Sequence, residues 1–155
     1  MATIRTATDA DAAHIARLWN GFIRDTTVTF TTLEKSHDQI TTLIDSRPVL
    51  VAETDGFAGF ATWGPFRAGP GYAHTAEVSV FAQHPGDGSA QALLAAAESQ
   101  ARTQGIHVLI AGISGENARA IRFFQRQGYA KTAEMPQVGR KFERWLDLIL
   151  MQKLI

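Results

Sequence analysis

The spacing of apolar residues along the chain predicts a mixture of helices and strands. A segment capped by Thr8 or Asp9 and running to about Arg24 carries apolar side chains at helical intervals. The same pattern recurs more briefly over 36–45. Short apolar runs of strand length, bounded by polar or turn-forming residues, occupy the ranges 3–6, 48–53, 57–63 and 74–82.

The second half of the chain predicts a further alternation of strands and helices. A glycine-rich turn over 84–90 opens a helix that Gly105 ends, because glycine is frequent just past a helix C-terminus. The elements after it are expected at 107–112 (strand), 117–127 (helix), 129–134 (strand) and 145–152 (strand). This order predicts a single domain over residues 1–155, an α/β fold of the mixed α+β kind with helices on both faces of a mixed sheet.

The charge balance argues against nucleic acids and anionic membranes as partners. Fifteen Lys and Arg residues balance fifteen Asp and Glu residues, so the chain lacks the positive field that nucleic-acid or anionic-membrane binding needs. There are no cysteines, and the five histidines lack metal-ligand spacing, so we expect neither disulfides nor a metal site. No secretory leader precedes the first strand and no apolar run is long enough to span a bilayer, so a cytoplasmic protein is expected.

The glycine-rich turn is the first candidate for chemistry. Gly86-Asp87-Gly88-Ser89-Ala90 leads from a strand into a helix, where free backbone N–H groups and the helix dipole favour a phosphate. The turn is neither a P-loop nor a complete dinucleotide fingerprint. Taken alone, it suits a purely structural turn as well as a phosphate site.

Two further features could carry function. Glu77 lies inside an otherwise apolar strand, and a carboxylate there must be exposed to solvent, paired or functional. The stretch Arg140–Trp145 mixes basic and aromatic residues before the last strand, which suits either an anion-binding rim or an ordinary solvated turn.

Four stretches, in the same order along the chain, resemble the phosphinothricin acetyltransferase group of the GNAT N-acetyltransferase superfamily. They are Gly64-Pro-Phe-Arg67 with Tyr72, the strand His74–Phe81, the unit Ala111–Tyr129 and the C-terminal stretch Val138–Gln152. The resemblance covers essentially the whole chain. It implies a GNAT fold, whose twisted mixed sheet of six to seven strands splays at its centre and seats acetyl-coenzyme A. It also implies a homodimer that acetylates the amine of a small amino-acid-like substrate, such as phosphinothricin, methionine sulfone or methionine sulfoximine.

The resemblance also implies roles for single residues. Glu77 matches the carboxylate that serves as general base and takes a proton from the attacking amine. The pantetheine strand, the pyrophosphate turn and the start of the final helix would hold the acetyl-coenzyme A through Val80, Phe81, Ala82, Gly86, Asp87, Gly88, Ser89, Ala90 and Asn117. Substrate contacts are expected from Phe30, Arg67, Tyr72, Arg140 and Lys141, since Arg offers a bidentate fork to an anion and aromatic rings can wall a pocket.

Three positions depart from the group's pattern. Pro85, which has no N–H, stands where the family turn begins with Arg or Gln. Asp87 adds a carboxylate beside the expected phosphates, and Phe124 stands where many superfamily members carry a tyrosine acid. Two alternatives therefore stay open: a degenerate acyl-coenzyme A-binding sensor without turnover, and an acetyltransferase for a protein or polyamine.

Overall fold

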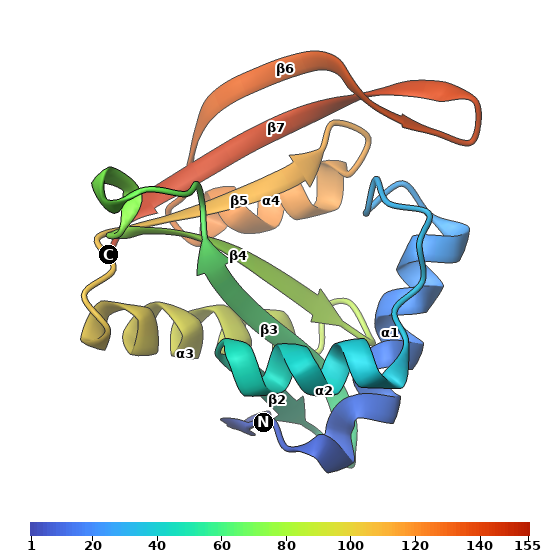
Figure 1. Ribbon diagram of the computed structural model, residues 1–155, viewed down its shortest axis with the longest axis vertical. Helices are drawn as coiled ribbons and strands as arrows, with labels where there is room; N and C mark the ends of the chain where they lie inside the picture. Colours follow the sequence, from blue (N-terminus) through green and yellow to red (C-terminus); the bar gives the residue numbers. More distant parts are fainter.

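A seven-stranded mixed sheet forms the centre of the molecule in a computed structural model that describes residues 1–155 (Figure 1). The spatial order of the strands is β1-β2-β3-β4-β5-β7-β6. Every neighbouring pair is antiparallel except β4 and β5, which are parallel. The strands are β1 (Thr3–Thr6), β2 (Val49–Glu53), β3 (Phe57–Pro65), β4 (Thr75–Ala82), β5 (Val108–Ser114), β6 (Ala130–Lys141) and β7 (Arg144–Leu154).

Four α-helices cover the two faces of the sheet, as the apolar spacing predicted. Helices α1 (Ala12–Asp25) and α2 (His37–Ser46) pack on one face, where Ile15 and Ile40 join a buried cluster with Phe60 and Phe81. Short 3₁₀ turns stand at Asp9–Asp11 and Pro70–Tyr72. No helix is both long enough and apolar enough to cross a membrane.

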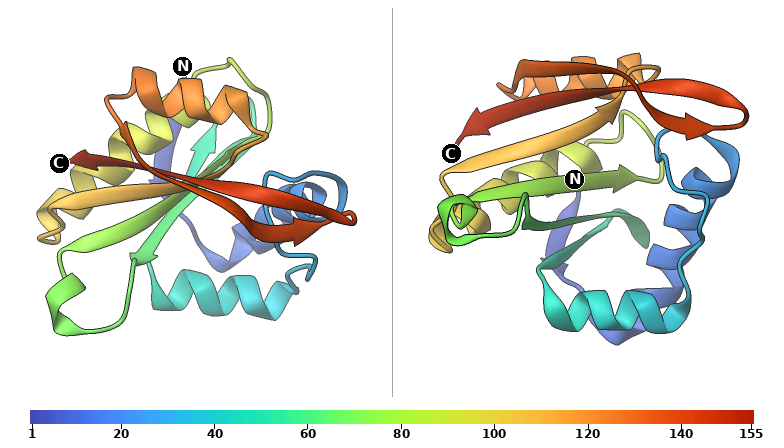
Figure 2. Two further views of the ribbon diagram at one scale, coloured as in Figure 1. Left: turned by 90° about the horizontal axis from the view of Figure 1, so that it is seen from above. Right: turned by 45° about the horizontal axis from the view of Figure 1, so that its top comes forward.

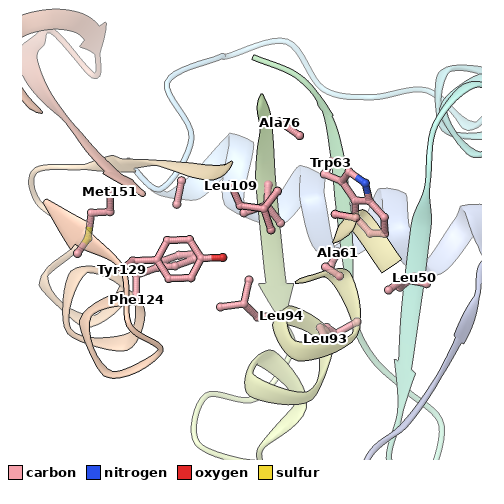
Figure 3. Close-up of a cluster of buried hydrophobic side chains, with 14 of the residues drawn as sticks. Leu50, Ala61, Trp63, Ala76, Leu93, Leu94, Leu109, Phe124, Tyr129 and Met151 are labelled. Atoms are coloured by element: carbon pink, nitrogen blue, oxygen red, sulfur yellow. The ribbon is translucent and has the colours of Figure 1, made fainter. Parts of the chain in front are cut away.

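The opposite face carries the larger core. Helices α3 (Ser89–Thr103) and α4 (Ala118–Arg126) lie there (Figure 2). Leu93 and Leu94 of α3 are fully buried against the sheet, and Phe124 of α4 meets Tyr129 edge to face (Figure 3). Because this cluster includes residues of β2, β3, β4, β5 and β7, it joins the two halves of the sheet.

The sheet splays at its centre, which confirms the expected fold class. Strands β4 and β5 pair over three residues only, Thr75 with Val108, Ala76 with Leu109 and Glu77 with Ile110. Beyond this fork they diverge, so that each strand keeps a neighbour on one side alone (Figures 1 and 2).

The C-terminal hairpin is longer than the sequence pattern indicated. Strand β6 was expected to end near residue 134, but it continues to Lys141, and β7 begins at Arg144. The pairing register shifts between Met135 and Gly139, and Gln137 takes a φ of 58° within this irregular stretch. An irregularity of this kind breaks the period-two pattern by which a strand is recognised in a sequence.

Candidate active site

A pocket of about 620 Å³ occupies the splay. The end of β4, the turn after it and helix α4 supply its walls. Six of the residues expected at acetyl-coenzyme A line it together: Val80, Phe81, Ala82, Gly86, Ala90 and Asn117. Pro85 and Phe124, two of the departures from the family pattern, lie in the same wall.

The backbone of β4 presents unpaired groups to this pocket. The Gln83 N–H donates to Ala58 O on the β3 side, and Thr75 O accepts from Phe66 N–H on that side as well. Successive residues of a strand direct their backbone groups to opposite sides. The backbone groups of even-numbered residues therefore point toward β5, and those of Val80 and Ala82, which lie beyond the three-residue pairing, face the splay.

The turn between β4 and α3 is open but carries its own negative charge. Gly86 and Gly88 adopt φ angles of 85° and 88°, and a methyl group at either position would have no neighbour within 4 Å. The Ser89 N–H at the start of α3 donates to the Asp87 Oδ1 at 2.8 Å. This hydrogen bond holds the pKa of Asp87 below its usual range, so the carboxylate is ionised at the mouth of the helix.

Three arginines of α4 face the pocket and were missed in the sequence analysis. Arg119, Arg122 and Arg126 lie at spacings of three and four residues, so they share one face of the helix and line the same pocket as Val80. Asn117 caps this helix, because its Oδ1 accepts from the Ala120 N–H at 3.1 Å. The spacing of the arginines after a helix cap was the signal available in the sequence.

Glu77 lies at the fork of the splay, as the last residue of β4 that pairs with β5. Its carboxylate extends over β5, since a Cβ at position 112 would come within 2.9 Å of the Glu77 Oε2. The residue is exposed, but it lines a small pocket whose protein atoms partly desolvate its carboxylate. This partial loss of solvation raises the pKa of Glu77 above its usual value.

Two adjoining pockets lie beside Glu77. A small one, about 180 Å³, contains Glu77 and Ser79, and a larger one, about 440 Å³, contains Arg67 and Tyr72. The Arg67 guanidinium stands 5.6 Å from the centre of the Tyr72 ring, in cation–π geometry. Arg47 lines both pockets and was not singled out in the sequence.

The remaining residues expected at the substrate lie at the C-terminal hairpin, apart from these two pockets. The Phe30 ring packs against Gly139, where a Cβ would come within 2.5 Å of its Cδ2. The Lys141 Nζ is buried and donates to Thr29 O at 2.8 Å, and burial lowers the pKa of Lys141. The Arg140 guanidinium stacks 4.3 Å from the centre of the Trp145 ring. The contacts of Phe30 and Lys141 fasten the loop between α1 and α2 to the hairpin.

This geometry agrees with what comparison with known proteins finds. A family described as "Acetyltransferase (GNAT) domain" matches residues 4–150. The chain belongs to the GNAT acetyltransferase family. Its members use acetyl-coenzyme A, and the pocket in the splay is where this acetyltransferase offers a free strand edge and a cationic wall.

The relatives of this acetyltransferase span nearly its whole length. L-methionine sulfoximine/L-methionine sulfone acetyltransferase of Salmonella typhimurium is 39% identical to this chain. The match covers 97% of this chain and 92% of the length of that relative. A Salmonella typhimurium acetyltransferase solved with acetyl-coenzyme A is 37% identical with a TM-score of 0.94, over 99% of this chain and 93% of that one. Ribosomal-protein-alanine N-acetyltransferase of Brucella melitensis is 36% identical with a TM-score of 0.94, over 99% of both chains. Phosphinothricin N-acetyltransferases of Streptomyces are also among the relatives, which confirms the expected group.

Proposed function

We propose that this acetyltransferase acetylates the α-amine of a free, small amino-acid-like substrate, with Glu77 as the general base. The observation that carries the proposal is the fork of the splay. There a carboxylate with a raised pKa lies on the same strand as the wall of the acetyl-coenzyme A pocket and lines one of two adjoining pockets that hold arginines.

The residues around the splay fit acetyl-coenzyme A, which supplies an acetyl group activated as a thioester. Val80 and Ala82 of β4 lie beyond the pairing with β5, so their backbone groups on that side are free to pair with the amides of the pantetheine arm. In this proposal a backbone N–H near Val80 would stabilise negative charge on the acetyl oxygen. Gly86 and Gly88 leave open space at the helix mouth, and Arg119, Arg122 and Arg126 supply positive charge from the facing wall.

The arginines of this facing wall can compensate for the hydrogen-bond donor that Pro85 removes from the phosphate site. A proline at the start of the turn removes one N–H from the phosphate site, and such a hydrogen bond to a charged group is worth about 1.5–3 kcal/mol. Three guanidinium groups on α4 offer several replacement donors across the same pocket. We therefore favour an active enzyme over a degenerate sensor.

Glu77 is suited to accept the proton of an incoming ammonium group. Only a neutral amine attacks a thioester, and an aliphatic amine is mostly protonated at neutral pH. Desolvation raises the pKa of Glu77, which makes its carboxylate a stronger base than an ordinary surface glutamate. Its place at the fork sets it three residues before Val80, which lines the acetyl-coenzyme A pocket.

The relatives support an amino-acid acceptor and also supply the second candidate. The Salmonella relative is named for L-methionine sulfoximine and L-methionine sulfone, both small amino acids with an oxidised sulfur. The Brucella relative is named for a ribosomal protein, so acetylation of a protein terminus is the alternative. The small volumes of the two pockets beside Glu77, about 180 and 440 Å³, favour the free amino acid.

A thiol-release assay across an amine panel tests the proposal. The panel holds methionine sulfone, methionine sulfoximine, phosphinothricin, ordinary amino acids and a peptide that ends in alanine. We expect turnover on one or more free amino acids, and Glu77→Gln should lower kcat roughly 10²–10⁴-fold at neutral pH. Glu134→Gln, which removes an exposed carboxylate from the outer strand β6, is the matched control and should retain kcat.

The pH profile separates a base from a positioning group. A carboxylate acts as a base only when ionised, so wild-type kcat should rise as pH rises through the raised pKa of Glu77. Glu77→Gln should lose that rise and keep its acetyl-coenzyme A affinity. If Glu77→Gln retains the wild-type pH profile, Glu77 is not the general base. If turnover is seen with the peptide alone, the protein substrate is favoured.

We further propose that the enzyme acts in the cytoplasm as a homodimer. The C-terminal hairpin supports the dimer, because it exposes four large apolar side chains: Met135, Val138, Phe142 and Trp145. Analytical ultracentrifugation of wild type and of Trp145→Glu measures the oligomeric state. A monomeric wild type would contradict the dimer.

A further inference from the structure

Arg47 is a cation without a protein partner beside the proposed general base. It is the C-cap of helix α2, where its backbone N–H donates to Leu43 O at 3.0 Å, so the start of its side chain is anchored. The chain contains seven ion pairs, and Arg47 takes part in none of them. A guanidinium has five N–H donors in a fixed fork that matches a carboxylate.

The guanidinium of Arg47 lies close against β3 at position 64, where glycine has no side chain. A Cβ on Gly64 would come within 2.7 Å of the Arg47 Cζ and Nη1, a distance that atoms do not tolerate. In the β3–β4 ladder, Gly64 is the direct partner of Glu77. The register of two strands therefore brings Arg47, which is distant in sequence, to the neighbourhood of Glu77.

Arg47 and Glu77 share a pocket without forming an ion pair. Both line the 180 Å³ pocket, yet no guanidinium nitrogen comes within 4.0 Å of the carboxylate. An ion pair would lower the pKa of Glu77, whereas that pKa is raised. The pocket thus holds an acid-binding group and a proton-accepting group with space between them.

From this arrangement, and on the basis of the function proposed above, we infer that Arg47 binds the α-carboxylate of the acceptor while Glu77 faces its α-amine. In an α-amino acid the amine and the carboxylate are attached to one carbon, which suits two groups within one small pocket. The side chain of the acceptor then extends into the adjoining 440 Å³ pocket, toward Arg67 and Tyr72. Arg47 thereby selects free α-amino acids over peptide termini, whose carboxyl is an uncharged amide.

The test compares each amino acid with its own carboxamide, which keeps the amine and the side chain but lacks the carboxylate charge. Wild type should prefer the acid in kcat/KM. Arg47→Gln should reduce this acid-to-amide preference ten- to a hundredfold, the equivalent of one charge-assisted hydrogen-bonded contact. Arg17→Gln removes another exposed arginine that has no ion pair, on α1, and should leave the preference unchanged.

Three results would overturn the inference, and they are distinguishable. If wild type accepts acid and amide equally, the proposed acetyltransferase function is retained, but Arg47 does not bind the α-carboxylate. If Arg47→Gln retains the wild-type preference, the carboxylate binds elsewhere, and the same ratio measured in Arg67→Gln locates it. If wild type releases no thiol with any amine, the proposed function fails and the inference fails with it. Thermal melting and acetyl-coenzyme A titration of each variant establish that the fold and the splay are intact.

Discussion

Replacing Asp87 with asparagine changes the charge at the mouth of α3 while conserving its hydrogen bond. The Asp87 Oδ1 accepts from the Ser89 N–H at 2.8 Å, and an asparagine Oδ1 can accept the same bond. The pyrophosphate of acetyl-coenzyme A would enter beside this carboxylate, since Gly86 and Ala90 on either side of it line the pocket. The negative charges of the Asp87 carboxylate and the pyrophosphate would then repel each other across open solvent.

The size of this repulsion follows from Coulomb's law in water. Two unit charges about 6 Å apart repel by about 0.7 kcal/mol, and a pyrophosphate carries roughly two, so the penalty is about 1.4 kcal/mol. Asp87→Asn should therefore bind acetyl-coenzyme A about tenfold more tightly. The cost to the helix dipole is smaller, about 0.3–1 kcal/mol of fold stability, and would appear as a lower Tm.

Calorimetric titration of acetyl-coenzyme A at low and high salt measures the effect. The gain in affinity should shrink as salt increases, because screening weakens exposed charge pairs. Since its hydrogen bond lowers the pKa of Asp87, the gain should stay constant around neutral pH and disappear only in acid, where the wild-type carboxylate is protonated. Asp38→Asn, which removes a first-turn carboxylate from α2, is the control. Equal or weaker binding by Asp87→Asn at low salt would refute the reasoning.

Three further substitutions test other parts of the site. Gly112→Ala places a Cβ within 2.9 Å of the Glu77 Oε2 and should lower kcat by roughly tenfold with little change in acetyl-coenzyme A Kd; an unchanged kcat would show that the carboxylate has room to move. Arg122→Gln should weaken acetyl-coenzyme A binding about tenfold by calorimetry, and equal affinity would exclude this arginine from the phosphate site. Lys141→Met leaves Thr29 O without its donor and should cost about 1–3 kcal/mol of unfolding free energy in urea titrations; wild-type stability would contradict the anchoring role.

The sequence was sufficient for the elements that depend on local pattern. The helices, the central strands and the glycine turn follow from apolar spacing and glycine placement, and the structure confirms them to within a few residues. The splay itself came from the family resemblance, because a three-residue pairing between two strands leaves no local trace. Glu77 stood out in the sequence because a carboxylate interrupts an apolar strand.

The arginines of α4 could have been found from their helical spacing, whereas other features depend on contacts between distant segments. Arg47 reaches the site through the register of β3 on β4 and through the absence of a side chain at Gly64. The irregular part of β6 hides its period-two pattern, so the hairpin was expected to be shorter. Lys141 was expected among the substrate contacts because it is a lysine in a basic cluster, whereas its burial against Thr29 is visible only in three dimensions.

The hydrogen bond between Lys141 and Thr29 joins positions 112 residues apart. This separation affects how the chain folds during its synthesis. A ribosome releases the N-terminal segments first, so the loop that holds Thr29 emerges long before the hairpin that will fasten it. Until the last residues are synthesised, β5 also lacks its partner β7 and presents bare edges. Premature termination within the final thirty or so residues should therefore yield a chain that aggregates rather than a smaller working enzyme.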